Sequence, residues 1–108
     1  MDTSILLRSD IATLVVVFTV EPENQEKLIQ ILEGGIETVM SKQAGCISAT
    51  FLKSKDGRRV ISYAQWRSGK DLEAGADRSQ PQVAAYFESV KALAKLEPIL
   101  CDVVSVHL

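Results

Sequence analysis

A tryptophan and a serine on one predicted strand are the residues of this chain best suited to chemistry. Trp66 is the only tryptophan among 108 residues, and Ser62 precedes it on the same strand. Because the side chains of a strand alternate between its faces, Ser62, Ala64 and Trp66 point the same way, and a large indole lies beside small neighbours. Such a row can form the wall of a ligand cavity. A lone tryptophan is more often a core residue whose N–H has a partner, so both interpretations stay open.

A hairpin is predicted to bring more small and aromatic side chains to this face. The predicted strands Cys46–Ser54 and Arg58–Arg67 flank Asp56 and Gly57, the pair preferred in a two-residue type I′ turn. This turn sets a register in which three facing pairs share one face: Phe51 opposite Ser62, Ala49 opposite Ala64, and Ile47 opposite Trp66.

Hydrophobic periodicity and capping residues predict the elements around this hairpin. They are a strand over Ile11–Val20, a helix that Pro22 opens and that ends before Gly45, a short helix capped by Ser68 and Asp71, a longer helix from Pro81 that Pro98 ends, and a last strand over Ile99–His107. Gly34 and Gly35 inside the first helix each cost about 1 kcal/mol relative to alanine. They indicate a kink, a close backbone contact or an ordinary weak spot.

The longer helix carries the aromatic residues that we expect to lie over the tryptophan. Tyr86 and Phe87 are candidates for the aromatic wall of a pocket. They also belong to a helical apolar stripe, which by itself indicates core packing. Ser62 has a similar alternative, because a small residue can simply fill space between larger ones.

The order strand, helix, strand, strand, helix, strand predicts an α+β fold, a ferredoxin-like βαββαβ sandwich with a four-stranded antiparallel sheet and its helices on one face. Sheet faces that meet water show polar residues at alternate positions. Ile11–Val20 is instead apolar on both faces. The face without helices is therefore expected to meet a partner, and a homodimer that packs sheet against sheet is the simplest arrangement.

Composition restricts the other functions that are open to the chain. With 46% hydrophobic and 24% charged residues, we expect one domain over residues 11–108 with an N-terminal extension over 1–10. A net charge of −2 with scattered basic residues argues against nucleic-acid binding. No apolar run is long enough for a membrane span and no signal-peptide pattern opens the chain, so we expect a cytoplasmic protein. Cys46 and Cys101 lack metal or redox spacing and are expected to be free thiols.

Several short segments resemble the antibiotic biosynthesis monooxygenase family of dimeric α+β barrel domains. These segments are the apolar first strand, Glu21-Pro22 at the start of the helix, the run 45–48 (Gly-Cys-Ile-Ser), and above all the run 63–68 (Tyr-Ala-Gln-Trp-Arg-Ser). The resemblance implies a homodimeric barrel with a pocket between sheet and helices in each subunit, near Trp66.

The resemblance also implies a cofactor-independent monooxygenase that oxidises a small electron-rich aromatic of the phenol, quinol or anthrone type with O₂. Trp66 would donate its indole N–H and Ser62 would orient a substrate oxygen. Ala49, Phe51, Ala64, Tyr86 and Phe87 would surround the substrate. No metal, flavin or haem is expected, because the electrons come from the substrate.

Two departures from the family leave a second hypothesis open. A haem-degrading branch has an asparagine on the first strand and a histidine on the helix after the tryptophan. This chain has neither, and its one histidine is His107. Haem degradation is therefore disfavoured. The helices also offer no obvious general base, since Asp71, Glu73 and Asp77 fit capping or surface positions. The alternative is a dimeric ligand-binding or structural module of the same fold without catalysis.

Overall fold

The computed structural model describes residues 10–108, and the order of its elements is the predicted one. The elements are β1 (Ala12–Val20), η1 (Pro22–Asn24), α1 (Gln25–Thr38), η2 (Met40–Lys42), β2 (Cys46–Lys53), β3 (Arg59–Trp66), α2 (Gly69–Gly75), α3 (Pro81–Lys91) and β4 (Ala94–Cys101). The predicted N-terminal extension lies outside the described residues, apart from Asp10.

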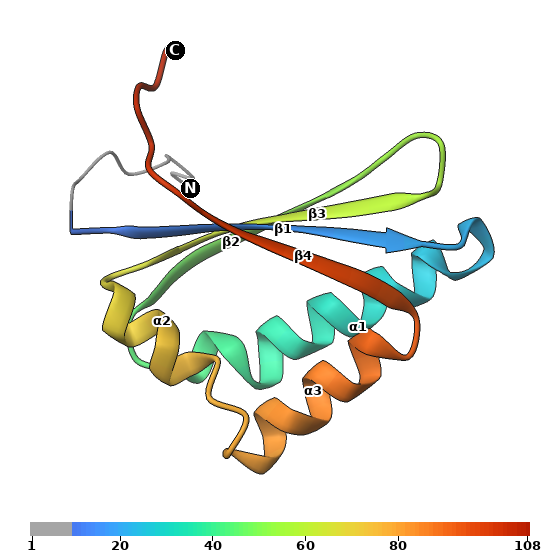
Figure 1. Cartoon of the computed structure of the whole chain (residues 1–108), viewed down its shortest axis with the longest axis horizontal. Helices are drawn as coiled ribbons and strands as arrows, with labels where there is room; N and C mark the ends of the chain where they lie inside the picture. The colour runs from blue at the N-terminus through green and yellow to red at the C-terminus, as the bar shows by residue number, and fades with distance from the viewer. Residues whose placement is uncertain (1–9) are drawn as a thin grey trace.

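The four strands form one antiparallel sheet in the order β2-β3-β1-β4, with α1, α2 and α3 on one of its faces (Figure 1). This is the predicted ferredoxin-like α+β sandwich. β1 is a central strand that pairs with both β3 and β4. Its central position accounts for its unbroken run of β-branched and apolar residues, which pack well on a pleated surface.

The β2–β3 hairpin has the predicted register but a different turn. Phe51 pairs with Ser62 and Ala49 with Ala64, as expected. The type I′ turn is wrong, because within the described residues only glycines have positive φ, and Asp56 is therefore excluded from that conformation. Gly57, at φ 80°, donates its N–H to the Ser54 carbonyl oxygen over 3.2 Å. The wider loop keeps the register because the Ser54 N–H still donates to the Arg59 carbonyl oxygen over 3.0 Å, and the Arg59 N–H donates to the Ser54 hydroxyl over 2.9 Å.

A β-bulge at the start of β2 changes which residue faces Trp66. The register shifts between Cys46 and Ser48, so that Cys46 pairs with Trp66 and the predicted Ile47–Trp66 pair is wrong. An extra residue in one strand turns the following side chains to the other face. Ile47 is consequently exposed, and Cys46 takes the position beside the indole.

The end of the chain differs most from the prediction. α3 ends at Lys91, earlier than the predicted end at Pro98, so that Leu93 and Ala94 lie beyond the helix. Pro98 does not stop a helix but lies inside β4, opposite Val16. Proline is tolerated there because β4 is an edge strand and need not donate on its outer side. β4 therefore begins and ends earlier than the predicted strand Ile99–His107. Residues 102–108 have no regular structure.

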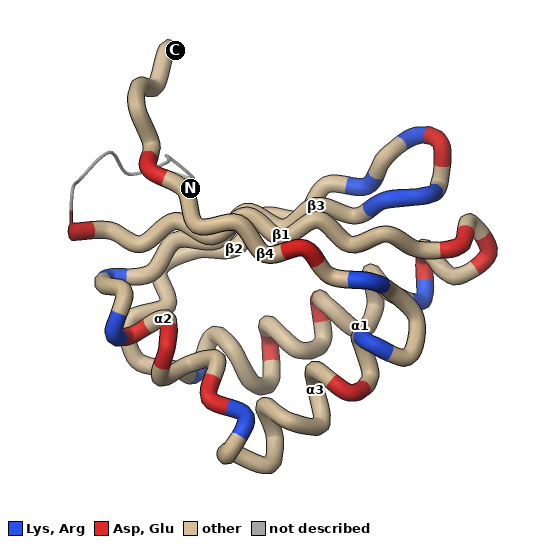
Figure 2. Tube along the Cα trace, viewed as in Figure 1, with Lys and Arg blue, Asp and Glu red and all other residues tan. Residues whose placement is uncertain are grey.

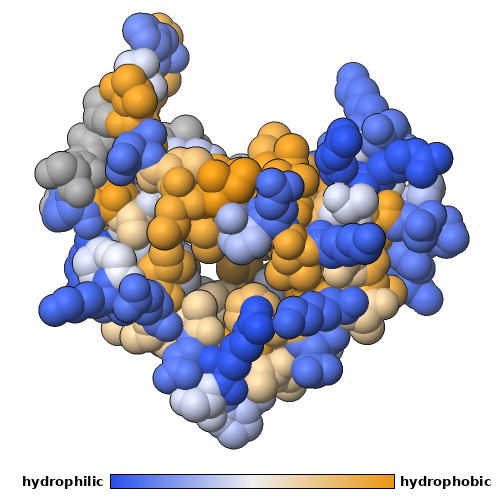
Figure 3. Space-filling view, in the orientation of Figure 1, coloured by the Kyte–Doolittle hydropathy of each residue, from blue (hydrophilic) through white to orange (hydrophobic). Residues whose placement is uncertain are grey.

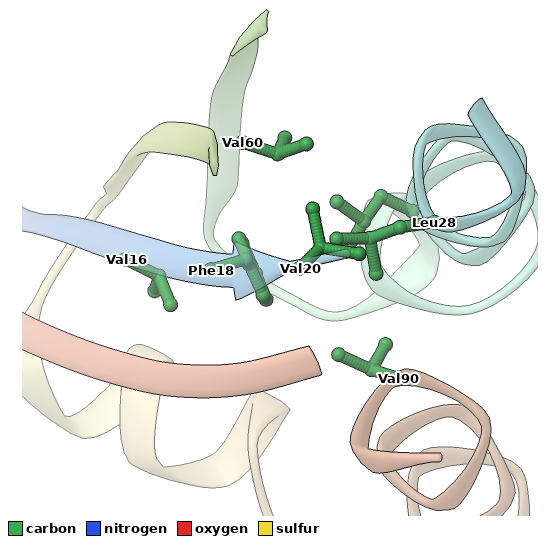
Figure 4. Close-up of a cluster of buried hydrophobic side chains, with 7 residues drawn as sticks. Val16, Phe18, Val20, Leu28, Val60 and Val90 are labelled. Atoms are coloured by element: carbon green, nitrogen blue, oxygen red, sulfur yellow. The ribbon is translucent and has the colours of Figure 1, made fainter. Parts of the chain in front are cut away.

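The core lies between the sheet and the first and third helices (Figure 4). It joins Val16, Phe18 and Val20 of β1 to Val60 of β3, Leu28 and Leu32 of α1, and Val90 of α3. Gln25 fixes the hairpin to α1, because its buried amide donates to the carbonyl oxygens of Ser54 at 3.1 Å and Arg59 at 3.0 Å.

Charged residues of both signs are scattered over the hairpin, the helices, the loops and β4 (Figure 2). None of the helices in residues 10–108 combines the length and apolar character that a membrane crossing requires.

Candidate functional site

A cavity of about 100 Å³ lies between the sheet and the helices. A hollow bordered by hydrophobic residues is visible in the space-filling view (Figure 3). All the residues predicted for the site line this cavity: Ala49, Phe51, Ser62, Ala64, Trp66, Tyr86 and Phe87. The structure thus brings them together, while their part in binding or catalysis stays a prediction.

The floor of the cavity is the inner face of β3. Ser62, Ala64 and Trp66 follow one another there at every second position. Ser62 is only 8% exposed, and its hydroxyl forms no hydrogen bond with any other residue of the described chain. Every fully buried side-chain oxygen of residues 10–108 has a partner, so this hydroxyl is open to the cavity and available to a ligand oxygen.

Trp66 is both a packed residue and a wall of the cavity. It is 2% exposed, and α2 holds it from one side, because a side chain at Gly75 would overlap the six-membered ring of the indole. Its N–H has no hydrogen-bond acceptor among residues 10–108, and it is not sealed inside the core. The two interpretations of a lone tryptophan therefore do not exclude each other here.

α2 begins where the sequence predicts. Ser68 is its N-cap and accepts a hydrogen bond from the Asp71 N–H over 3.1 Å. Arg67 binds the Asp71 carboxylate over 2.9 Å and lowers the pKa of that half-buried group. These contacts fix the turn between Trp66 and α2, and so the position of Gly75 against the indole.

Tyr86 and Phe87 reach the cavity from α3. Their rings meet edge to face, with centroids 5.4 Å apart and planes at 60°. The Arg78 guanidinium lies 4.4 Å from the centroid of the Phe87 ring, a favourable cation–π contact. The Tyr86 ring packs against Gly35 of α1, where a Cβ would overlap it, whereas nothing lies within 4 Å of Gly34. Among the interpretations predicted for Gly34 and Gly35, a close backbone contact is therefore correct for Gly35.

We expect the phenol of Tyr86 to make stability depend on alkaline pH. Burial raises the pKa of Tyr86 to about 12 from 10.0. The folded protein therefore holds the phenolic proton where the unfolded chain releases it, and stability should be lost as the pH rises from 10 towards 12. Tyr86→Phe keeps the ring and removes the ionisation. Urea denaturation between pH 8 and 12 should show a smaller loss for this variant, and an equal loss would contradict the assignment.

Sequence reasoning missed the other half of the cavity wall. The bulge in β2 brings in Cys46, and the helices contribute aliphatic residues, among them Ile36, Met40, Leu72 and Ala76. Ile36 and Met40 follow one another at helical spacing, which predicts only that they face the interior. Periodicity tells which face is buried and not whether that face is filled, so no signal in the sequence separates the two.

The wall of the cavity is almost entirely apolar. Its polar groups are the Ser62 hydroxyl, the Trp66 N–H, the Tyr86 phenol and the Cys46 thiol, and no lining residue of the described chain carries a carboxylate, an ammonium or an imidazole group. In residues 10–108 there is also no cluster of three His, Cys, Asp or Glu side chains. His107 lies on the opposite face of the sheet, in a hollow between the C-terminal residues and β1.

The family model for antibiotic biosynthesis monooxygenase matches residues 11–89. The chain belongs to this family. It is 38% identical over 94 residues to the tetracenomycin-F1 monooxygenase of Streptomyces glaucescens, a match that covers 87% of this chain and 82% of that protein.

Solved structures agree with the family. The ActVA-Orf6 monooxygenase of Streptomyces coelicolor, solved with the ligand nanaomycin D, is 27% identical, with a TM-score of 0.80 over 92% of each chain. SnoaB, a cofactor-independent oxygenase of Streptomyces nogalater, is 21% identical, with a TM-score of 0.74 over 91% of this chain and 97% of that one. The SnoaB likeness shows the shared fold. Together, the matches support a monooxygenase.

Proposed function

We propose that this chain is a cofactor-independent monooxygenase that oxidises a small electron-rich aromatic with O₂ in the cavity between sheet and helices. The observation that carries the proposal is an apolar cavity to which two polar groups, the Ser62 hydroxyl and the Trp66 N–H, are open without a hydrogen-bond partner in the described chain. A water-poor site strengthens each hydrogen bond that such groups make to a developing negative charge.

The substrate supplies the electrons in this reaction. For an anthrone, loss of one proton from the reactive CH₂ gives a carbanion that adds O₂. The resulting peroxide takes up a proton, and loss of water then leaves a ketone. One oxygen atom enters the product and the other leaves as water, so no external reductant is needed. Ser62 would hold the substrate oxygen, and Trp66 would donate to the peroxide as charge develops.

The cavity does not supply an ionisable base for the first proton. The lining residues of the described chain include no carboxylate or imidazole, so the substrate must lose this proton to solvent or bind as its anion. Turnover should therefore follow the acidity of the substrate. The cavity of about 100 Å³ is smaller than the cavity of about 150 Å³ that holds benzene. Residues at its mouth would therefore have to move to admit an aromatic substrate, and more so for a fused-ring one.

Oxygen consumption tests the proposal. Purified protein is mixed with naphthols, anthrones and related phenols, with a metal chelator present and no added flavin or haem. Trp66→Phe and Ser62→Ala should lower kcat about ten- to a hundredfold, because each removes a donor to developing charge. Ser48→Ala is the matched control, an exposed serine on β2 that does not line the cavity. Binding without oxygen uptake across the panel would favour the non-catalytic module instead.

We also propose a homodimer through the face of the sheet that carries no helices. Val15 and Val17 of β1 are only partly buried on this face, and further apolar side chains on it are open to solvent, including Ile99, which pairs with Val15, at 41% and Val104 at 88% exposed. A second copy would cover these groups with the same surface, as in a two-fold symmetric contact.

Val17→Lys should separate the dimer into monomers or unfold the chain, because an unpaired charge in an apolar interface is costly. Sedimentation at micromolar concentration should give twice 11.8 kDa for the natural chain and a single mass for the variant. Gln30→Lys, on the exposed surface of α1, adds the same charge and should leave the dimer intact. A sedimentation mass of 11.8 kDa for the natural chain would contradict the proposed dimer.

A further inference from the structure

The β-bulge in β2 places a thiol on the wall of the cavity. Cys46 pairs with Trp66 and lines the same space as Ser62. It is a free cysteine and half-buried, so its sulfur can meet a bound ligand. The second thiol, Cys101, lies outside this cavity, in the hollow on the opposite face of the sheet. The chain thus carries one thiol at the cavity and one elsewhere.

Ser62 independently indicates that a ligand with a polar atom belongs in this cavity. Ser62 is more than nine-tenths buried, and its hydroxyl is open to the cavity without a hydrogen-bond partner in residues 10–108. Along β3, Ser62 is four positions from Trp66, so it lies roughly 13 Å from the end of the sheet where Cys46 stands. A ligand admitted to this space would extend along the row from the Ser62 hydroxyl towards the Cys46 thiol.

We propose that Cys46 is a site of covalent addition for quinones that occupy the cavity. The inference rests on the proposed function only for the origin of such a quinone, which is a product of phenol oxidation. In the addition, sulfur forms a bond to an unsubstituted carbon of the quinone ring. The S–H proton and the proton of that carbon end on the two quinone oxygens. The quinone is reduced to a hydroquinone thioether, and no other oxidant or reductant takes part.

Proximity, and not acidity, selects this thiol. Burial raises the pKa of the Cys46 thiol above its ordinary value, so little thiolate is present at neutral pH. A quinone held against the thiol reacts at a high effective concentration, which compensates for the small thiolate fraction. A polar reagent that does not enter an apolar cavity gains no such advantage. The adduct would fill the cavity beside Trp66 and stop turnover.

The test compares, at each cysteine, the rate of reaction with a quinone and the rate of reaction with iodoacetamide. The intact protein is treated under anaerobic conditions with 1,4-naphthoquinone or with iodoacetamide, and peptide mass mapping gives the rate at each cysteine. Dividing the quinone rate by the iodoacetamide rate removes differences in accessibility and in pKa. We expect this ratio to be about tenfold or more higher at Cys46 than at Cys101. Naphthalene, which does not react with thiols, should compete for the same space and lower the quinone rate at Cys46 and not at Cys101.

Cys46→Ser should remove the fast-reacting site, and Cys101→Ser should leave it. Protein unfolded in urea should show equal ratios at both positions. Equal ratios in the folded protein, or no protection by naphthalene, would overturn the proposal. Labelling needs neither O₂ nor turnover, so its outcome is separate from that of the oxygen-consumption test. Labelling without oxygen uptake would reject only the oxygenase, and oxygen uptake without preferential labelling would reject only the thiol site.

Discussion

Gly35→Ala should destabilise the protein by about 1–3 kcal/mol, although alanine is the better helix former. The new Cβ would overlap the ring of Tyr86, which packs directly on the backbone of α1. Gly34→Ala is the matched control in the next position of the same helix. Nothing lies within 4 Å of the new Cβ, so this variant should gain about 0.5–1 kcal/mol. Urea denaturation measures both values.

A second substitution identifies the cause. In a Tyr86→Ala background the ring is absent, and Gly35→Ala should then become neutral or stabilising. The difference between the two backgrounds is the coupling between the residues. An equal loss in both backgrounds would show that the ring is not the obstacle. In the natural background, the displaced ring has the cavity on its free side, so ligand affinity should fall together with stability.

Gly75→Ala should change activity more than stability, because its Cβ would meet the outer ring of Trp66. The indole must move, and a shift of about 1 Å at a reacting group can lower turnover about a hundredfold. Trp66 is the only tryptophan, so its fluorescence reports the movement directly. Gly69→Ala is the control at the other end of α2, where the added methyl group meets open space. Its fluorescence and turnover should match those of the natural chain.

The smaller ring of phenylalanine provides the check on this result. Gly75 leaves room for the outer atoms of the indole ring. A phenylalanine side chain lacks these atoms. Gly75→Ala should therefore cost less stability in a Trp66→Phe background than in the natural one. The same loss in both backgrounds would place the obstacle elsewhere, for example at Gln43, whose Cβ lies 3.4 Å from the added methyl group.

The sequence predicted the fold because its strands and helices alternate with clear periods. The face of β3 that lines the cavity followed from side-chain alternation and from the register of the hairpin. The register held although the turn type was wrong, since the pairing of Phe51 with Ser62 is compatible with a wider loop.

The bulge at Ile47 could not be predicted, because an apolar residue suits either face of the strand. Cys46 was therefore missed at the cavity. In the same way, two adjacent glycines are indistinguishable in the sequence, and only the packing of α3 on α1 decides that Gly35 meets Tyr86. Pro98 was taken as the end of a helix because its tolerance in a strand depends on that strand being at an edge, which is a tertiary property.

Pro98 has a consequence for how copies of this chain can associate. Open strand edges are templates for uncontrolled addition of further strands, and proteins interrupt them with proline, charge or bulges. β4 carries Pro98 between exposed charged residues, Lys95 and Glu97, on one side and Ile99 on the other. β2, at the other edge, carries the bulge at Ile47. Both edges are thus poor templates for amyloid-like growth, even at the high concentrations reached in overexpressing cells.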